Sequence, residues 1–350
     1  MYPTLIIGLG GTGARVTSDI YKRFMAGKPT ADEQSSLVCL CFDSDPQDIN
    51  VLRNQLPDGN VVKISEGRQV GELEVMDRSI ERLAANQAEN VQIHIICSLA
   101  GNTGARLFLQ YANRVRNAAR ALGIESPQVT GFFILGDVFC KSGVAMRPGS
   151  NKGSLLSDTY INLKALRRDS LYDLCYLMGY GKHYATLEGH CSALAEFVYH
   201  YAVSPLGESI RTIMYPASVW RQIQKDSSMR YATFGLSKLA YPIDGSFREK
   251  IDECRARADI LGDQYNLLRS RREFCWLGNQ LCFRCFINAW GLPDGNIQVP
   301  DDLRSLYDRT SYVTTSRFFK NEIVMVNTAF LLSLEMLSFY AEYNAGPKRK

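Results

Sequence analysis

The sequence lacks the features that mark several broad classes of protein. It has no run of about eighteen apolar residues, so we expect no membrane insertion. A formal net charge of +4 is too small to predict a nucleic-acid partner, and the basic ending 348–350 is too short to act as a binding arm. No internal repeat or low-complexity segment is present. With 46% hydrophobic residues among 350, the chain can bury a large core, enough for two domains.

Cysteine is present, but it is not arranged as a disulfide framework or a complete metal site. Cys282 and Cys285 have the spacing of half a zinc site, yet no Cys or His pair follows them. We therefore favour a helix face packed in the core there, and we expect no metal site. The first strand begins by Thr4, which leaves no room for a signal peptide and predicts a cytoplasmic protein. Reduced, buried thiols are expected at Cys39, Cys41, Cys97 and Cys175.

Strand and helix patterns alternate through the first half of the chain. Continuous apolar runs that alternate with helices predict an α/β fold, with a parallel sheet covered by helices on both faces. The expected strands are 4–8, 37–42, 61–64, 92–97, 128–135 and 173–178. The expected helices are 12–25, 72–89, 104–122 and 158–168, with a long loop at 136–157.

The pattern changes in the second half. Residues 190–203 are expected to form a helix with Leu194, Phe197, Val198 and Tyr201 on one face. A strand at 232–241 ends at Pro242. Residues 246–290 are expected to be mostly helical, and 322–343 to form an apolar final helix. We therefore predict a first domain at 1–189, a connecting core helix at 190–204 and a more helical second domain at 205–350.

Two glycine-rich turns are the most informative feature. Residues 8–14 (Gly-Leu-Gly-Gly-Thr-Gly-Ala) follow the first strand, and residues 100–105 (Ala-Gly-Asn-Thr-Gly-Ala) follow the strand at 92–97. Each turn opens a helix, so it presents unpaired backbone N–H groups and the positive end of a helix dipole to an anion. Two such turns in one sheet predict a ligand with several phosphates, held from two sides.

Taken alone, the first glycine turn also fits another class of protein, the dinucleotide-binding enzymes. Gly8-x-Gly10-x-x-Gly13 is the dinucleotide fingerprint, and Asp43 at the end of the second strand could hold a ribose. An NAD(P)-dependent oxidoreductase with a Rossmann domain is therefore an alternative. It leaves the second glycine turn unexplained, and no proton-transfer group stands out. A structural interaction protein with a vestigial nucleotide pocket and an unidentified protein partner is a further alternative.

The order of these loops resembles the tubulin/FtsZ superfamily, in particular its divergent bacterial tubulin-like branch. Residues 8–14 stand where that family has its first glycine loop, and Asp43 or Asp45 where it has an acidic residue near the nucleotide. Residues 66–71 match its third loop, and 100–106 match its phosphate-binding signature at the second glycine, the Thr and the next glycine. The strand at 128–135, the helix at 190–203 and the strand at 233–241 follow in the family's order.

The resemblance implies a guanine nucleotide (GTP or GDP) with Mg²⁺ across the strand ends. Backbone N–H groups of the first loop would contact the α- and β-phosphates, and those of the second loop the terminal phosphates. Glycine is needed because a Cβ would block the approach of the ligand. Asp43 or Asp45 would hold a Mg²⁺-bound water or the ribose, Arg106 would neutralise phosphate charge, and Glu196 would face the base. The implied nucleotide-binding residues are Gly10, Gly11, Thr12, Gly13, Asp43, Asp45, Gly71, Ala100, Gly101, Asn102, Thr103, Gly104, Arg106 and Glu196.

The resemblance also implies self-assembly into head-to-tail filaments. In that superfamily an acidic residue of the next subunit completes the hydrolytic site, so GTP hydrolysis is weak or depends on assembly. Glu208 and Asp226 are the candidates for this catalytic acid, since the family's Asn/Asp-rich turn after the core helix has no clear match. Asn102 and Arg106 also depart from the family signature.

Overall fold

The computed structural model describes most of the first 210 residues and four strands beyond them. The described residues are 2–64, 70–87, 91–124, 127–143, 152–180, 184–208, 210, 231–240, 280–281, 310–319 and 322–331. The strands are β1 (Thr4–Leu9), β2 (Leu37–Asp43), β3 (Val61–Lys63), β4 (Gln92–Ser98), β5 (Gln128–Ile134), β6 (Leu174–Met178), β7 (Tyr231–Ala240), β8 (Gln280–Leu281), β9 (Thr310–Phe319) and β10 (Glu322–Leu331).

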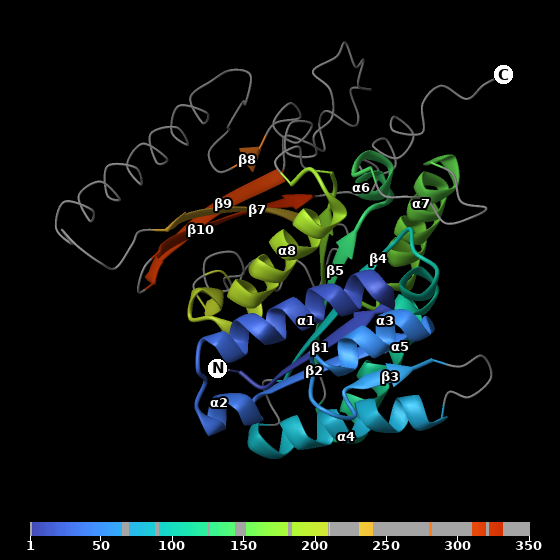
Figure 1. Cartoon of the computed structure of the whole chain (residues 1–350), viewed down its shortest axis with the longest axis vertical. Coiled ribbons are helices and arrows are strands. Elements are labelled where there is room, and N and C mark those ends of the chain that lie inside the picture. Colours follow the sequence, from blue (N-terminus) through green and yellow to red (C-terminus); the bar gives the residue numbers. More distant parts are fainter. Residues whose placement is uncertain are drawn as a thin grey trace, which may run out of the picture.

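The helices alternate with the first six strands (Figure 1). They are α1 (Gly10–Ala26), α2 (Ala31–Ser35), α3 (Pro46–Arg53), α4 (Val70–Gln87), α5 (Thr103–Ala121), α6 (Gly136–Lys141), α7 (Lys152–Asp169) and α8 (Leu187–Val198). A π-helical turn, η2 (Tyr199–Val203), continues α8, so the predicted helix at 190–203 is present. The predicted α/β fold is confirmed.

The strands form one sheet in the order β3-β2-β1-β4-β5-β6-β7-β10-β9-β8. Strands β1 to β7 pair in parallel, and β10 pairs antiparallel with both β7 and β9. The chain runs outward from β1 to β3 and then returns to place β4 on the other side of β1. This reversal is a topological switch point, where the loops after β1 and β4 diverge and leave room for a ligand.

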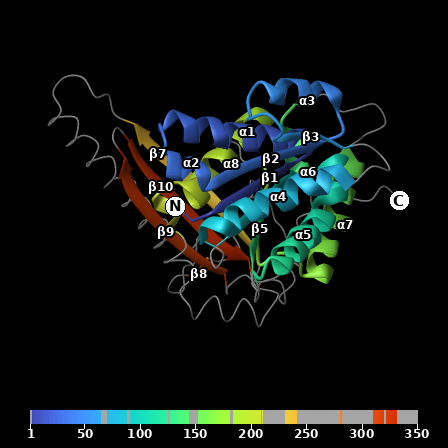
Figure 2. The ribbon, with the colours of Figure 1, turned by 90° about the horizontal axis from the view of Figure 1, so that it is seen from below.

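The core has two layers because successive strand residues point to opposite faces of the sheet. Leu5 and Ile7 pack on the face covered by α4, α5 and α7, whereas Ile6 packs on the face covered by α1, α3 and α8. Figure 2 shows α1 and α3 on one side of β1 and β2, and α4 and α5 on the other. Helices therefore shield both faces of the sheet from water, which explains the continuous apolar runs of the strands.

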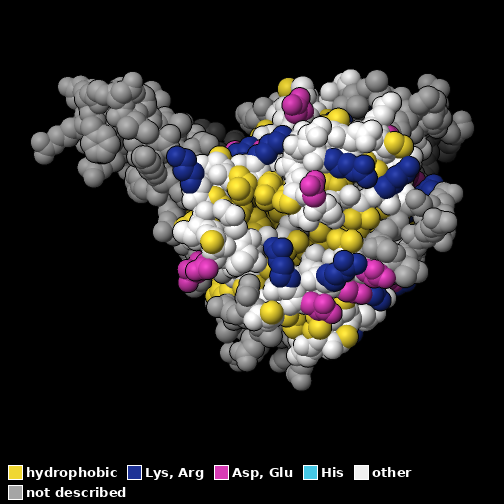
Figure 3. Space-filling model, turned by 60° about the horizontal axis from the view of Figure 1, so that its bottom comes forward, with side chains coloured by type: hydrophobic (Ala, Val, Ile, Leu, Met, Phe, Trp, Pro, Cys, Tyr) yellow, Lys and Arg dark blue, Asp and Glu magenta, His cyan; other side chains and the backbone are white. Residues whose placement is uncertain are grey.

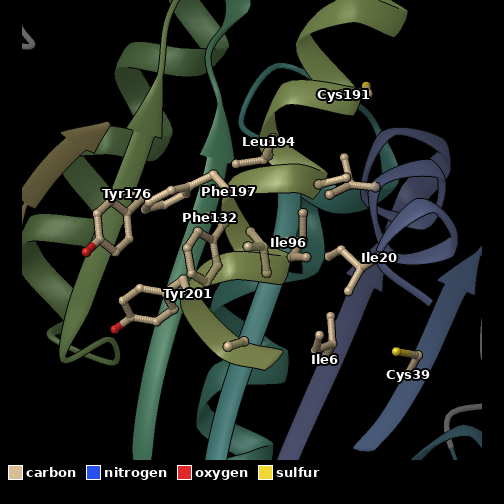
Figure 4. Packing of buried hydrophobic residues seen from close by; sticks show 14 of the residues in the cluster. Ile6, Ile20, Cys39, Ile96, Phe132, Tyr176, Cys191, Leu194, Phe197 and Tyr201 are labelled. Atoms are coloured by element: carbon tan, nitrogen blue, oxygen red, sulfur yellow. The ribbon is translucent and has the colours of Figure 1, made fainter. Parts of the chain in front are cut away.

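Aromatic rings join the connecting helix to the sheet (Figure 4). Phe132 of β5 stacks on Tyr176 of β6, with ring centroids 5.3 Å apart. Phe197 of α8 meets Tyr176 edge-on at 4.9 Å, and Tyr201 of η2 meets the same ring at 5.4 Å. These buried contacts fix α8 against the strands, so α8 is a core helix rather than a surface one.

Three sequence expectations are wrong in the described residues. Residues 322–331 form strand β10 and not a helix, because they pair along their whole length with β7 and also with β9. Residues 136–157 are not one long loop, since they contain α6 and the start of α7. Residues 280–281 are a strand, within a stretch expected to be helical. The remainder of 246–290, with Cys282 and Cys285, and residues 332–343 lie outside the described residues, and the domain boundaries stay a prediction.

The distribution of charged side chains on the described surface agrees with the small net charge of the sequence. On the face shown in Figure 3, Lys and Arg side chains are spread out, with Asp and Glu side chains between several of them. Among the helices that the structure describes, none has the length and apolar character that a membrane span requires. The four cysteines expected to be buried thiols are buried thiols in the structure: Cys39, Cys41, Cys97 and Cys175.

Candidate functional site

The two glycine turns meet because β1 and β4 are adjacent strands. Gly8 of β1 pairs with Ile96 of β4, so the following turns leave the sheet side by side. Gly10 has a φ of +69°, which favours glycine. A Cβ at Gly10 would lie 3.1 Å from the backbone nitrogen of Gly104 and 3.3 Å from the Thr103 Cβ. The two turns therefore form one continuous surface.

A cavity of about 250 Å³ lies against this surface; we call it the loop cavity. It brings together most of the residues that the sequence assigned to phosphate binding. Those that line it are Gly10, Gly11, Thr12, Asp43, Ala100, Gly101, Asn102, Thr103 and Gly104.

The helices that start at the loop cavity have unusual N-termini. Neither α1 nor α5 has a side-chain cap or an acidic residue in its first turn. By contrast, Thr30 caps α2, Asp45 caps α3 and Thr186 caps α8 through side-chain oxygens. Within the described part of the chain, the first N–H groups of α1 and α5 thus receive no cap from the N-cap side chain, and both helix dipoles present their positive ends at the cavity. This arrangement can hold an anion.

Asp43 supplies a buried carboxylate beside the two turns. Only 3% of its surface is exposed. Its Oδ1 accepts the backbone N–H groups of Ser44 (2.7 Å) and Asp45 (3.3 Å) and the Thr103 hydroxyl (3.4 Å). Its Oδ2 has no hydrogen-bond partner among the described residues. Burial raises the pKa of the Asp43 carboxyl, and nearby Asp48 raises it further. An oxygen of this kind, in a residue that lines a cavity, can accept a hydrogen bond from a ligand or a bound water.

Two of the predicted glycines serve packing first. A Cβ at Gly13 would collide with the carbonyl oxygen of Ile96, so Gly13 lets α1 approach β4. A Cβ at Gly104 would lie only 2.8 Å from the Cys97 Cβ and from the Leu9 carbonyl oxygen. Close packing within the protein therefore explains why both positions are glycine. At Gly104 this explanation needs no contact with a ligand.

Other predicted residues lie away from the loop cavity. Asp45 accepts the Gln47 N–H at 2.9 Å as the cap of α3. Arg106 is exposed on α5, and Glu196 pairs with Arg23 at 3.7 Å. None of these three lines the cavity.

The structure gives less information on the last three predicted site residues, Gly71, Glu208 and Asp226. Gly71 lies in the first turn of α4, and the residues just before that helix lie outside the described part. Glu208 is exposed shortly after η2. Asp226 lies outside the described residues.

Sequence reasoning missed several cavity residues. Arg15 follows Gly11 by four residues and therefore shares its helix face, a spacing that could have revealed it. Asp48 lies in the first turn of α3, a few residues after the predicted acidic residues Asp43 and Asp45. Leu9 and Ser98 are the last residues of β1 and β4, at the start of the two glycine turns. The three apolar residues from α6, α7 and α8 reach the cavity from elements distant in sequence. The missed residues are Leu9, Arg15, Asp48, Ser98, Phe139, Leu155 and Leu187.

A second cavity adjoins the first along the outer face of α1. This helix groove, of about 530 Å³, is bordered by α3 on one side and α8 on the other. The loop cavity and the helix groove share three lining residues: Gly11, Arg15 and Asp48.

Near the loop cavity, the first turn of α6 carries a second buried acid. Asp137 is 1% exposed and accepts the Tyr180 N–H at 2.9 Å. Burial raises the pKa of the Asp137 carboxyl to about 6, against the lowering effect of this hydrogen bond and of Lys141. Asp137 thereby ties α6, which contributes Phe139 to the cavity, to the segment that leads from β6 to α8.

The sheet topology and the glycine turns at its switch point define a doubly wound α/β protein. A family model described as "Tubulin like" matches residues 63–251, more than half of the chain. The chain belongs to this tubulin-like family. No curated protein matches its sequence.

The fold of this chain is similar to that of solved structures from other proteins. CetZ from Methanosaeta thermophila matches with a TM-score of 0.51 and 11% identity, over 98% of this chain and 91% of that one. TubZ of Bacillus thuringiensis serovar israelensis, solved as GDP-form protofilaments, matches with a TM-score of 0.51 and 10% identity, over 98% and 89%. At these identities the likeness shows the fold alone.

Proposed function

We propose that this protein binds a guanine nucleotide in the loop cavity and assembles head to tail into filaments. The observation that carries the proposal is the meeting of two uncapped helix N-termini at adjacent glycine turns. One such turn holds a single anionic group, whereas two facing turns suit a chain of phosphates.

The residues present fit the phosphate part of such a ligand. The first turns of α1 and α5 carry no acidic side chain that would repel phosphate. A Cβ at Gly101 would have no atom nearer than 3.7 Å, so the protein itself does not require glycine there. Close approach of a ligand to the Gly101 backbone would explain why this residue is glycine.

Asp43 fits the role of the carboxylate beside the phosphates. Its unpartnered Oδ2 would accept a hydrogen bond from a Mg²⁺-bound water or from a ribose hydroxyl. The described residues contain no cluster of three His, Cys, Asp or Glu side chains for a metal ion. Mg²⁺ commonly relies on one or two carboxylates together with phosphate oxygens, so Asp43 suffices for this role when nucleotide is bound.

The support for assembly and hydrolysis is family membership and not the geometry of the loop cavity. The TubZ relative was solved as protofilaments in its GDP form. We propose that this chain forms filaments by a head-to-tail contact and that an acid of the next subunit, Glu208 or Asp226, completes a weak hydrolytic site. Glu208 is exposed and thus accessible to a neighbouring subunit.

Identification of the bound nucleotide tests the proposal. Protein purified without added nucleotide is denatured by heat, and the released small molecules are separated and identified. Guanine nucleotide supports the proposal. A nicotinamide dinucleotide would instead contradict the proposal and favour oxidoreductase activity, since Rossmann domains share the strand order from β3 to β6.

A competition assay then measures the choice of base. We expect GTP to bind at least about tenfold more tightly than ATP, a difference of about 1.4 kcal/mol. Equal affinities would contradict the guanine assignment and leave the phosphate site in place.

A further inference from the structure

Arg15 occupies the junction of the loop cavity and the helix groove. It lines both, together with Gly11 and Asp48. Among the described residues that line the loop cavity, Arg15 is the one cationic side chain. It follows Gly11 by one helical turn, so its side chain leaves α1 on the same face as the glycine turn.

Arg15 is held only loosely where it is. Its Nη2 lies 3.8 Å from Oδ1 of Asp48, and 61% of its side chain is exposed. Exposed ion pairs of this kind contribute little to stability. A guanidinium binds phosphate through two parallel N–H···O bonds, which are stronger than such a loose pair. A phosphate group in the loop cavity could therefore draw Arg15 away from Asp48.

Asp48 is placed to oppose anion binding. A Cβ added to Gly11 would collide with Oδ2 of Asp48, so this carboxylate lies beside the backbone that opens α1. It adds negative charge to a cavity that already contains Asp43. While it pairs with Arg15, it also reduces the positive charge available to a ligand.

We infer that Arg15, and not Arg106, neutralises the phosphate charge of the ligand, and that Asp48 restrains Arg15 until the ligand is bound. This inference rests on the proposed binding of a nucleotide in the loop cavity. It names a residue that the glycine motifs alone do not indicate, and it assigns Asp48 an effect on affinity opposite in sign to that of Arg15.

The test compares ligands that differ in the number of phosphates. GTP, GDP, GMP and inorganic tripolyphosphate are titrated calorimetrically in EDTA at fixed ionic strength, so that no divalent cation contributes. The proteins are the wild type, Arg15→Ala, Arg106→Ala, Asp48→Asn and Arg15→Ala/Asp48→Asn. Arg78→Ala is the matched control, since Arg78 is an exposed arginine of α4, paired with Glu74 on the same helix. Circular dichroism confirms that each variant is folded.

We expect Arg15→Ala to weaken GTP binding by about tenfold or more, which is the usual range for a charge-assisted hydrogen bond. The loss should diminish from GTP to GDP to GMP and should reappear with tripolyphosphate. Asp48→Asn should tighten GTP binding, and this gain should shrink when Arg15 is absent, as expected for coupled residues. Arg78→Ala should bind like the wild type.

Three results would overturn the inference: an unchanged affinity in Arg15→Ala, an equal loss for GMP and GTP, or a larger loss in Arg106→Ala. If tripolyphosphate binds in an Arg15-dependent way but GTP and ATP bind equally, the inference stands and the guanine assignment fails. If no phosphate ligand binds to the wild type, both the inference and the proposed function are wrong.

Discussion

Gly101 and Gly104 lie three residues apart in the same turn, yet an added Cβ would meet different surroundings. At Gly101 the nearest atom would be the Ser98 Cβ at 3.7 Å, an ordinary van der Waals contact. At Gly104 the new atom would lie 2.8 Å from the Leu9 carbonyl oxygen, which belongs to the backbone and cannot easily move. At the residue scale, the fold requires Gly104 and the proposed ligand requires Gly101.

Alanine at each position separates the two requirements. We expect Gly101→Ala to change the free energy of unfolding by no more than about 0.5 kcal/mol while weakening nucleotide binding. Gly104→Ala should cost at least about 1 kcal/mol of stability, because the new methyl group overpacks the contact between α5 and β1. Urea denaturation and calorimetric titration measure the two effects. Unchanged nucleotide affinity in a stable Gly101→Ala protein would contradict the assigned approach of the ligand.

Asp137 should make stability depend on pH. Burial raises the pKa of its carboxyl in the folded protein to about 6, from an ordinary value of 3.8. Between these values the folded state binds more protons than the unfolded state, so the contribution of Asp137 to stability falls as pH rises from about 4 to 6 and is constant above that. A shift of this size corresponds to roughly 3 kcal/mol.

The measurement is urea unfolding of the wild type and Asp137→Asn across this pH range. The free energy of unfolding of the wild type minus that of the variant should fall between pH 4 and 6. A difference that stays constant with pH would mean that Asp137 does not titrate in this range.

At the scale of elements, α1 and α5 begin without a side-chain cap, as α6 also does, and they lack the acidic first-turn residue that α6 has. Helices α2, α3 and α8 satisfy part of their first turn with a side-chain oxygen, whereas α1 and α5 do not. A missing cap usually costs stability. The uncapped ends lie together at the loop cavity, so the N–H groups that would otherwise be capped remain available to an anion.

An acid at the N-terminus of α5 should therefore affect stability and binding in opposite directions. Asn102→Asp places a negative charge at the positive end of the helix, and we expect it to stabilise the protein by up to about 1 kcal/mol. The same charge should weaken GTP binding by about tenfold, since it competes with phosphate for the same N–H groups.

The comparison variant is Thr30→Ala, which removes the cap of α2. It should lower stability by about 1 kcal/mol and leave GTP binding unchanged. Tighter GTP binding in Asn102→Asp would refute the role assigned to the α5 N-terminus.

At the scale of the whole molecule, activity should depend on assembly. If an acid of the next subunit completes each site, the site exists only at a contact between subunits. A head-to-tail contact whose rotation does not close a ring generates a filament. The exposed position of Glu208 is compatible with such a contact.

Turnover per molecule should therefore rise with protein concentration, and light scattering should rise after GTP and Mg²⁺ are added. Glu208→Ala and Asp226→Ala, made separately, identify the acid. The variant that lacks it should still bind GTP and assemble but should hydrolyse GTP more slowly. Turnover that is independent of concentration, or a monomer in analytical ultracentrifugation with GTP present, would leave a nucleotide-binding monomer.

Local sequence was sufficient for the first six strands and the turns that follow β1 and β4. Their signals are contained in single segments: apolar runs such as 92–97, glycines directly after them, and a helical pattern beyond. Because both faces of a parallel sheet are buried, such runs have few other stable arrangements. The α/β class and the meeting of the two glycine turns at one edge of the sheet were predictable for this reason.

Pairing between distant segments decided the rest. The apolar stretch at 322–331 suits a buried helix or a buried strand equally well, and its partners β7 and β9 make it a strand. Whether Gly104 contacts a ligand or the backbone of β1 depends on the adjacency of β1 and β4, which only the strand order shows. Likewise, Arg15 and Asp48 come together because α1 and α3 pack side by side. A sequence records which groups can donate, accept or carry charge, but the neighbours of each group are set by the packing of the whole chain.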